Sequence, residues 1–96
     1  MDKKLSKADA EIQLDSDRFL VTRWVFPPNS ETGWHRHNYD YVVVPLSDGV
    51  LTLESEQGEH EGVLKKGGSY SRREGVEHNV VNKGDSEISF IEIELK

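Results

Sequence analysis

The chain has 96 residues and a formal net charge of −6 at pH 7, with 34% hydrophobic and 31% charged residues. A chain of this length forms one small domain, and we expect a homodimer because the core of one copy is small. The negative charge argues against nucleic acid or an anionic membrane as a partner. No apolar run approaches the roughly 20 residues that cross a bilayer, and the N-terminus lacks the apolar region of a signal peptide, so a cytoplasmic location is expected.

The sequence contains no cysteine. Disulfides, thiolate metal sites and cysteine nucleophiles are therefore excluded, and a metal would be held by His, Asp, Glu or Tyr side chains. We find no Ser-His-Asp spacing, phosphate-binding loop or paired carboxylates that would support another catalytic scheme.

Residues 1–8 are charged and expected to be flexible, and residues 9–96 are expected to form the domain. Short runs rich in β-branched and aromatic residues follow, separated by turn signals such as Pro27-Pro28-Asn29 and Asp48-Gly49. The predicted strands are Glu11–Leu14, Arg18–Phe26, Gly33–His37, Tyr41–Leu46, Val50–Glu56, Glu61–Leu64, Ser69–Arg72, Glu77–Asn82 and Ile88–Leu95. The strand Tyr41–Leu46 is apolar throughout and is expected to be buried on both faces.

No window shows a 3.6-residue apolar stripe over three turns, so little helix is expected. Eight or nine short strands at about ten-residue spacing predict an all-β antiparallel sandwich or barrel.

Two histidines, His35 and His37, stand two residues apart and share one face of an extended chain. A third, His78, follows in a later strand, within a Gly-x-x-His-x-x-x-Asn pattern. These residues resemble the two motifs of the cupin superfamily, G-x5-H-x-H-x3,4-E-x6-G and G-x5-P-x-G-x2-H-x3-N. The first motif maps onto Asn29, His35, His37, Tyr41 and Gly49, and the second onto Gly67, Arg73, Gly75, His78 and Asn82.

The resemblance covers residues 29–82 and implies a small single-domain cupin, a double-stranded β-helix or jelly-roll barrel. It also implies that His35, His37 and His78 hold one divalent metal, which could be Fe, Mn, Ni or Zn. Within the superfamily, the chain is similar to stand-alone small cupins that include a bacterial protein named for β-alanine degradation. That similarity implies a setting in small-molecule metabolism.

Tyr41 departs from the family pattern because it stands where the motif has a glutamate ligand. Its neighbour Asp40 would replace that ligand if the strand phase shifted by one residue. A phenol has a reference pKa of about 10 and coordinates only when acidified, so Tyr41 is more credible as a neutral catalytic hydrogen-bond donor. A packed barrel aromatic is the alternative interpretation. Asn29 replaces a glycine, and Asn tolerates left-handed φ well.

Several other side chains could line the cavity. Arg72 and Arg73, with Arg36, could bind a substrate carboxylate, and Tyr70 and Tyr39 could form part of the wall. His60 lies in a charged turn and is expected at the surface, whereas Asn82 is expected to fix a turn or a neighbouring strand. Trp24 and Trp34 are expected in the core or in a dimer interface.

Two functions remain open from the sequence. One is a metalloenzyme, of the dioxygenase or of the isomerase or lyase kind, acting on a small carboxylate-bearing metabolite. The other is a small-molecule binding or sensing module of the same fold, without turnover and without a catalytic metal. The complete histidine set favours the first, and the missing glutamate favours the second.

Overall fold

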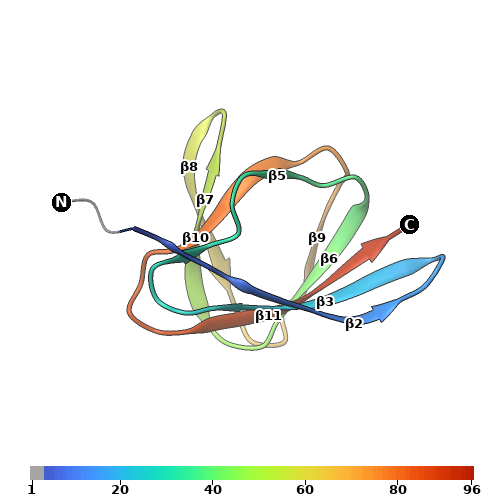
Figure 1. Ribbon diagram of the computed structural model, residues 1–96, viewed down its shortest axis with the longest axis horizontal. Coiled ribbons are helices and arrows are strands. Elements are labelled where there is room, and N and C mark those ends of the chain that lie inside the picture. The colour runs from blue at the N-terminus through green and yellow to red at the C-terminus, as the bar shows by residue number, and fades with distance from the viewer. Residues whose placement is uncertain (1–3) are drawn as a thin grey trace.

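The computed structural model describes residues 4–96, which form two β-sheets and contain no helix (Figure 1). The six-stranded sheet has the order β1 (Ser6–Lys7), β4 (Ser30–Glu31), β10 (Glu77–Asn82), β7 (Gly49–Ser55) and β8 (Gly58–Leu64), with β5 (His35–Arg36) also paired to β10. The five-stranded sheet has the order β2 (Asp9–Asp15), β3 (Phe19–Phe26), β11 (Ile88–Leu95), β6 (Asp40–Pro45) and β9 (Tyr70–Arg72). Among these residues there is therefore no helix that could span a membrane. The all-β jelly-roll prediction is confirmed.

The N-terminal part of the fold differs from the prediction. Residues 1–3 of the segment expected to be flexible lie outside the described residues. Ser6–Lys7 form β1, which pairs in parallel with β4, and Ala8 is buried. The predicted strand Gly33–His37 shortens to β5, because only His35 and Arg36 pair with β10.

The core lies between the sheets and is centred on Phe26, which is fully buried and stacks on Phe90 with ring centroids 5.6 Å apart. Strand β6 alternates more strictly than its apolar sequence suggests. Tyr41, Val43 and Pro45 are buried, whereas the valines between them are only half-buried, which corrects the expectation of burial on both faces. The inward residues of β6 and β11 form the wall on which the site is built.

The outer face of the five-stranded sheet carries a continuous apolar row. Leu14, Val21, Ile93 and Val42 lie opposite one another across β2, β3, β11 and β6. Leu14 is 57% exposed. The homodimer stays a prediction, and this row is the surface on which we expect it to form.

Two turn residues of the motifs have left-handed backbone. Asn29 has φ 59°, in agreement with the expectation for an asparagine at a glycine position. Gly75 has φ +92°, and its N–H donates to the His37 carbonyl at 2.8 Å. The Gly75 turn therefore holds the chain just after His37, and any side chain there would strain it.

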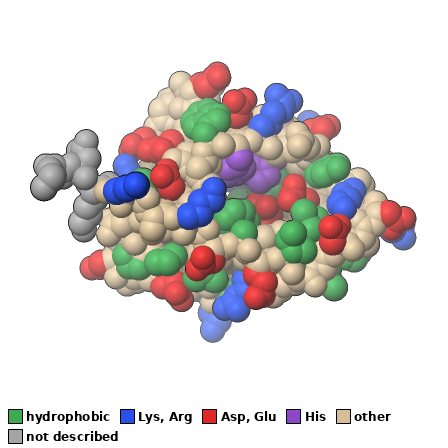
Figure 2. All heavy atoms as spheres, viewed as in Figure 1, with side chains coloured by type: hydrophobic (Ala, Val, Ile, Leu, Met, Phe, Trp, Pro, Cys, Tyr) green, Lys and Arg blue, Asp and Glu red, His purple; other side chains and the backbone are tan. Residues whose placement is uncertain are grey.

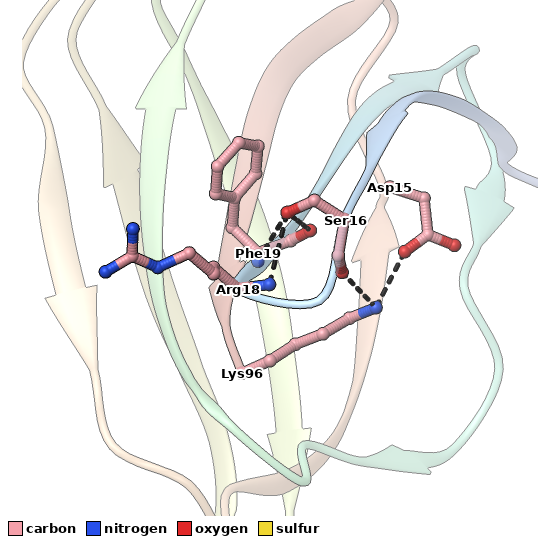
Figure 3. A network of polar contacts seen from close by, with 5 residues as sticks. All are labelled: Asp15, Ser16, Arg18, Phe19 and Lys96. Atoms are coloured by element: carbon pink, nitrogen blue, oxygen red, sulfur yellow. Dashed lines mark hydrogen bonds and ion pairs between the residues drawn. The ribbon is translucent and has the colours of Figure 1, made fainter.

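The turn between β2 and β3 is contacted by Lys96, the residue that follows β11 (Figure 3). The Lys96 ammonium donates to the Asp15 carboxylate at 2.6 Å and to the Ser16 carbonyl at 2.8 Å. The Ser16 hydroxyl accepts the N–H groups of Arg18 and Phe19 at 3.2 and 3.1 Å. These contacts tie the end of β11 to the β2–β3 turn.

Candidate metal centre

The three histidines of the motifs meet at one point of the barrel. His35 on β5 lies directly opposite His78 on β10, and His37 follows β5 by one residue. The His37 Nε2 atom is 3.1 Å from the His35 Nε2 atom and 3.2 Å from the His78 Nε2 atom. Two nitrogens bound to one ion at about 2.1 Å lie about 3.0–3.4 Å apart for octahedral to tetrahedral angles. The three side chains therefore fit a single divalent metal.

The orientation of His35 is fixed by its surroundings. Its Nδ1 atom lies 2.9 Å from the Gly33 carbonyl oxygen, so this nitrogen carries the proton and donates it. The Nε2 lone pair is then free to face the other two histidines. A backbone carbonyl in this role is the usual partner of a metal-binding imidazole.

A buried asparagine supports the loop that carries His35. The Asn79 Oδ1 atom accepts the Gly33 N–H at 2.9 Å, and its Nδ2 group donates to carboxylates of Glu31 and Glu54 at 2.8 and 2.9 Å. Thr32 joins the same network through its hydroxyl. Sequence reasoning missed Asn79 as a positioning residue, because only the fold shows that its side chain reaches across to residues 31–33.

The environment keeps two of the imidazoles neutral. Burial, reinforced by the neighbouring His35 and His78, lowers the pKa of His37 to about 4. Burial, with His35 and Arg72 nearby, lowers the pKa of His78 to about 4. A neutral imidazole has the lone pair that a metal needs, so no proton has to be displaced from these two residues near pH 7.

Tyr41 occupies the position of the missing glutamate and faces the histidines. Its ring stacks on His37 with centroids 3.9 Å apart and an interplanar angle of 18°. Burial, followed by the charge of Glu92, raises the pKa of the Tyr41 hydroxyl above its usual range. The phenol is therefore neutral and suited to donate a hydrogen bond or to pack, but not to coordinate as phenolate.

Asp40 does not join the histidines, which corrects its assignment as a fourth ligand. The strand keeps the phase that turns Tyr41 inward, so Asp40 is exposed on the opposite side. Its Oδ1 atom accepts the Glu74 N–H at 2.8 Å and is engaged in that turn.

Two carboxylates that the sequence analysis overlooked lie beside His37. Glu92 and Glu94 on β11 each place a carboxylate oxygen within 4.8 Å of a His37 ring nitrogen and of each other. Glu94 lies opposite Tyr41, and Glu92 lies opposite Val43, on the inward face. The statement that no paired carboxylates are present is therefore wrong. Their positions in the strand could have indicated this, because Glu92 and Glu94 continue the alternate, inward-facing positions of Ile88 and Phe90.

Glu92 is only 8% exposed. Burial, followed by the charge of Glu94, raises the pKa of Glu92 to about 7, and the Trp24 indole N–H opposes this rise. Burial also raises the pKa of Glu94, whereas His35 and Lys96 oppose that rise. The interior of the barrel therefore holds a carboxyl group that changes charge near neutral pH.

We expect the stability of Glu92→Gln, relative to that of the native metal-free protein, to increase as the pH rises. The folded native protein binds the Glu92 proton more tightly than the unfolded chain does. The stability that this proton contributes to the native protein is therefore complete below about pH 4.5 and is lost as the pH rises through about 7. The difference in free energy of unfolding between Glu92→Gln and the native sequence should therefore grow by about 2–3 kcal/mol from pH 4.5 to pH 8.

Urea denaturation at a series of pH values measures this difference. The lowered pKa values of His37 and His78 make the stability of both proteins rise with pH. Because this contribution is the same in both proteins, it cancels in the difference. A difference that stays constant with pH would contradict the burial of an ionisable carboxyl group at this position.

A cavity of about 470 Å³ opens over the histidines. On the face shown in Figure 2, the histidine side chains lie in a hollow, with acidic and hydrophobic side chains around them. The walls include the aromatic side chains Trp24, Tyr41, Tyr70 and Phe90, together with Arg72, His60 and Glu92. The size suits a small ligand rather than a macromolecule.

The structure separates the predicted substrate-binding residues. Arg72 and Tyr70 line the cavity, and the Arg72 guanidinium lies 4.6 Å from the centre of the Tyr70 ring. Arg73 is not among the residues that line this cavity and instead lines a second depression beside Asp40, which Arg72 also borders. His60 is exposed, as predicted, but it borders the cavity.

The remaining candidates have structural or surface positions. Arg36 and Tyr39 are exposed and are not among the cavity-lining residues. Trp24 packs against the core as expected, whereas Trp34 is 52% exposed and its indole N–H donates to Glu77 at 2.9 Å.

Residues 22–94 match the family described as the cupin domain. The chain is a cupin. It is 49% identical over 85 residues to the beta-alanine degradation protein BauB of Pseudomonas aeruginosa, an alignment that covers 88% of this chain and 90% of that protein. It also resembles the crystal structure of a cupin domain from Bordetella pertussis, with 52% identity, a TM-score of 0.96 and 99% coverage of both chains.

More distant cupins share the fold. A cupin with a double-stranded β-helix fold from Methanocaldococcus jannaschii matches with a TM-score of 0.74 at 14% identity, covering 99% of this chain and 85% of that one. At this identity the likeness concerns the fold alone. Together the matches agree with the cupin resemblance of the two sequence motifs.

Proposed function

We propose that this cupin binds one divalent first-row metal through His35, His37 and His78 and acts on a small carboxylate-bearing metabolite in the cavity above it. The observation that carries the proposal is the convergence of the three Nε2 atoms, at 3.1 and 3.2 Å, at the floor of that cavity. A bound metal would supply Lewis acidity or redox chemistry to a ligand held there.

The chain's own residues supply the rest of the site. Arg72 carries a fixed positive charge at the cavity wall and suits a ligand carboxylate. Tyr41, kept neutral by its surroundings, is placed to donate a hydrogen bond to a ligand or water beside His37. The name of the Pseudomonas relative supports amino-acid metabolism, with β-alanine as the first compound to test.

The alternative is a binding or sensing module that holds a small molecule without turnover. Tyr41 favours it, because the family glutamate is absent from this position and a buried neutral phenol does not replace a charged ligand. Both functions require a small carboxylate to bind in the same cavity, so the first experiment measures binding of such a ligand rather than turnover.

We expect Arg72→Gln to weaken the binding of β-alanine by about tenfold, since one charge-assisted contact to the carboxylate is lost. The matched control is Arg73→Gln, which removes the adjacent arginine outside the cavity and should leave the affinity within about twofold. Isothermal titration of the metal-loaded proteins measures both. Equal losses in the two variants would argue that general positive charge, and not Arg72, attracts the ligand.

A further inference from the structure

The most buried acidic side chain that lines the cavity has no cationic partner within residues 4–96. This side chain is Glu92, which is 8% exposed and lines the cavity. No salt bridge within residues 4–96 involves it, since the two ion pairs of the described chain are Lys83–Glu59 and Lys96–Asp15. A buried carboxylate left in this state is costly, and such groups are normally paired.

The indole N–H of Trp24 does not satisfy this carboxyl group. The Trp24 indole N–H faces Glu92, yet in the part of the chain that the structure describes its buried nitrogen closes no hydrogen bond. No lysine is among the residues that line the cavity. Glu92 lies opposite Val43 on β6, and Val43 in turn lies opposite Tyr70 on β9. Arg72 is two residues further along β9, so it is not in register with Glu92.

Aromatic rings surround the same point. Trp24, Tyr41, Tyr70 and Phe90 all line the cavity with Glu92. A carboxylate beside aromatic faces is the arrangement that binds an organic ammonium group, through charge, hydrogen bonds and cation–π attraction. Three carboxyl groups and one guanidinium line this cavity, namely Glu56, Glu77, Glu92 and Arg72, so a zwitterion meets groups of both signs.

We propose that Glu92 is the specificity residue of the cavity and binds the ammonium group of a small amino acid whose carboxylate faces Arg72 and the histidines. This inference deepens the proposed function and rests on it for the position of the carboxylate. It assigns a substrate class, small zwitterions with separated amino and carboxylate groups, and it assigns to Glu92 a role distinct from metal ligation.

Two nearly isosteric probes test the assignment. β-Alanine and butanoate have the same chain length and carboxylate, but butanoate has a methyl group where β-alanine has the ammonium. Isothermal titration is carried out with the native sequence, with Glu92→Gln and with Glu87→Gln. Glu87 is the matched control because it is an exposed carboxylate directly before β11 and is not a cavity-lining residue. The metal content of each sample is measured by elemental analysis.

We expect the native sequence to bind β-alanine at least about tenfold more tightly than butanoate, since butanoate leaves the buried carboxylate unpaired. Glu92→Gln should bind the two probes within about threefold of each other, and Glu87→Gln should keep the native preference. Glu92→Asp, which keeps the charge on a shorter side chain, should retain part of it. Metal content should be the same in all four proteins.

Three results would overturn the assignment. These are the absence of a preference for β-alanine in the native sequence, an undiminished preference in Glu92→Gln, and a loss of metal in Glu92→Gln, which would make Glu92 a ligand of the ion. A native protein that lacks metal but prefers β-alanine would contradict the proposed metal function and still support the role of Glu92.

Discussion

Replacing His37 with alanine is expected to lower the affinity for divalent metal by more than about 100-fold, the upper end of the loss seen when only a supporting residue is removed. His37 is the shared member of the two short Nε2 pairs, so its loss leaves only His35 and His78. It is also the most buried of the three histidines, at 5% exposure, so we expect that a water molecule does not readily take its place as a ligand of the metal. Competition between the protein and a chromophoric chelator for Zn²⁺ or Mn²⁺ measures the change.

His60→Ala is the matched control for this experiment. His60 borders the same cavity but is exposed and lies outside the group of converging nitrogens. We expect its metal affinity to stay within about twofold of the native value, since it donates nothing to the ion. Similar losses in both variants, or a His37→Ala protein that binds metal as the native one does, would contradict the assignment of the ligands.

Replacing Asn82 with alanine is expected to destabilise the fold by about 3 kcal/mol or more. The Asn82 amide is fully buried and donates to the carbonyls of Phe26 and Ser86, both at 2.9 Å, while its oxygen accepts the Gly84 N–H at 3.0 Å. Alanine leaves these backbone groups without partners, and each one costs about 1–3 kcal/mol when buried.

Urea denaturation of Asn82→Ala beside Asn38→Ala measures this cost. Asn38 is exposed, so its replacement should change stability by no more than about 0.5 kcal/mol. If the urea midpoint of Asn82→Ala equalled that of the control, Asn82 would not hold the end of β3 to the turn before β11.

Much of the fold could be predicted because its strands are short, β-branched and separated by strong turn signals. The predicted strands Glu77–Asn82 and Ile88–Leu95 agree with β10 and β11 at both ends. β1 and β4 were missed because each has only two residues and is defined by pairing with a distant part of the chain. No local pattern can indicate such a strand.

The histidine triad could be predicted from the resemblance to the two cupin motifs, but the acidic side of the site could not. β11 has apolar residues on both faces, with Phe90 inward and Ile91 and Ile93 outward, so alternation alone does not tell which face carries the core. Glu92 and Glu94 were therefore overlooked. Adjacent Arg72 and Arg73 posed a similar problem, because only the structure shows that Arg72 ends β9 and lines the histidine cavity, whereas Arg73 follows the strand and lines only the neighbouring depression.

The substitution at Tyr41 also has a consequence for the family comparison. The family glutamate would add a carboxylate on β6, opposite Glu94. In this chain the inward carboxyl groups come from the neighbouring strand β11 and lie within 4.8 Å of a His37 ring nitrogen, while the Tyr41 ring stacks on His37. The acidic side chains near the histidines therefore lie one strand away from the family position.

Elemental analysis of untagged protein, grown with Fe, Mn, Ni and Zn available, tests whether three histidines without the family glutamate hold a metal. The native sequence is expected to contain about one divalent ion per chain. The double variant His35→Ala, His78→Ala should contain almost none, because only one of the three converging nitrogens remains. Near-zero metal in the native protein, or equal amounts in both proteins, would contradict a metal centre formed by His35, His37 and His78.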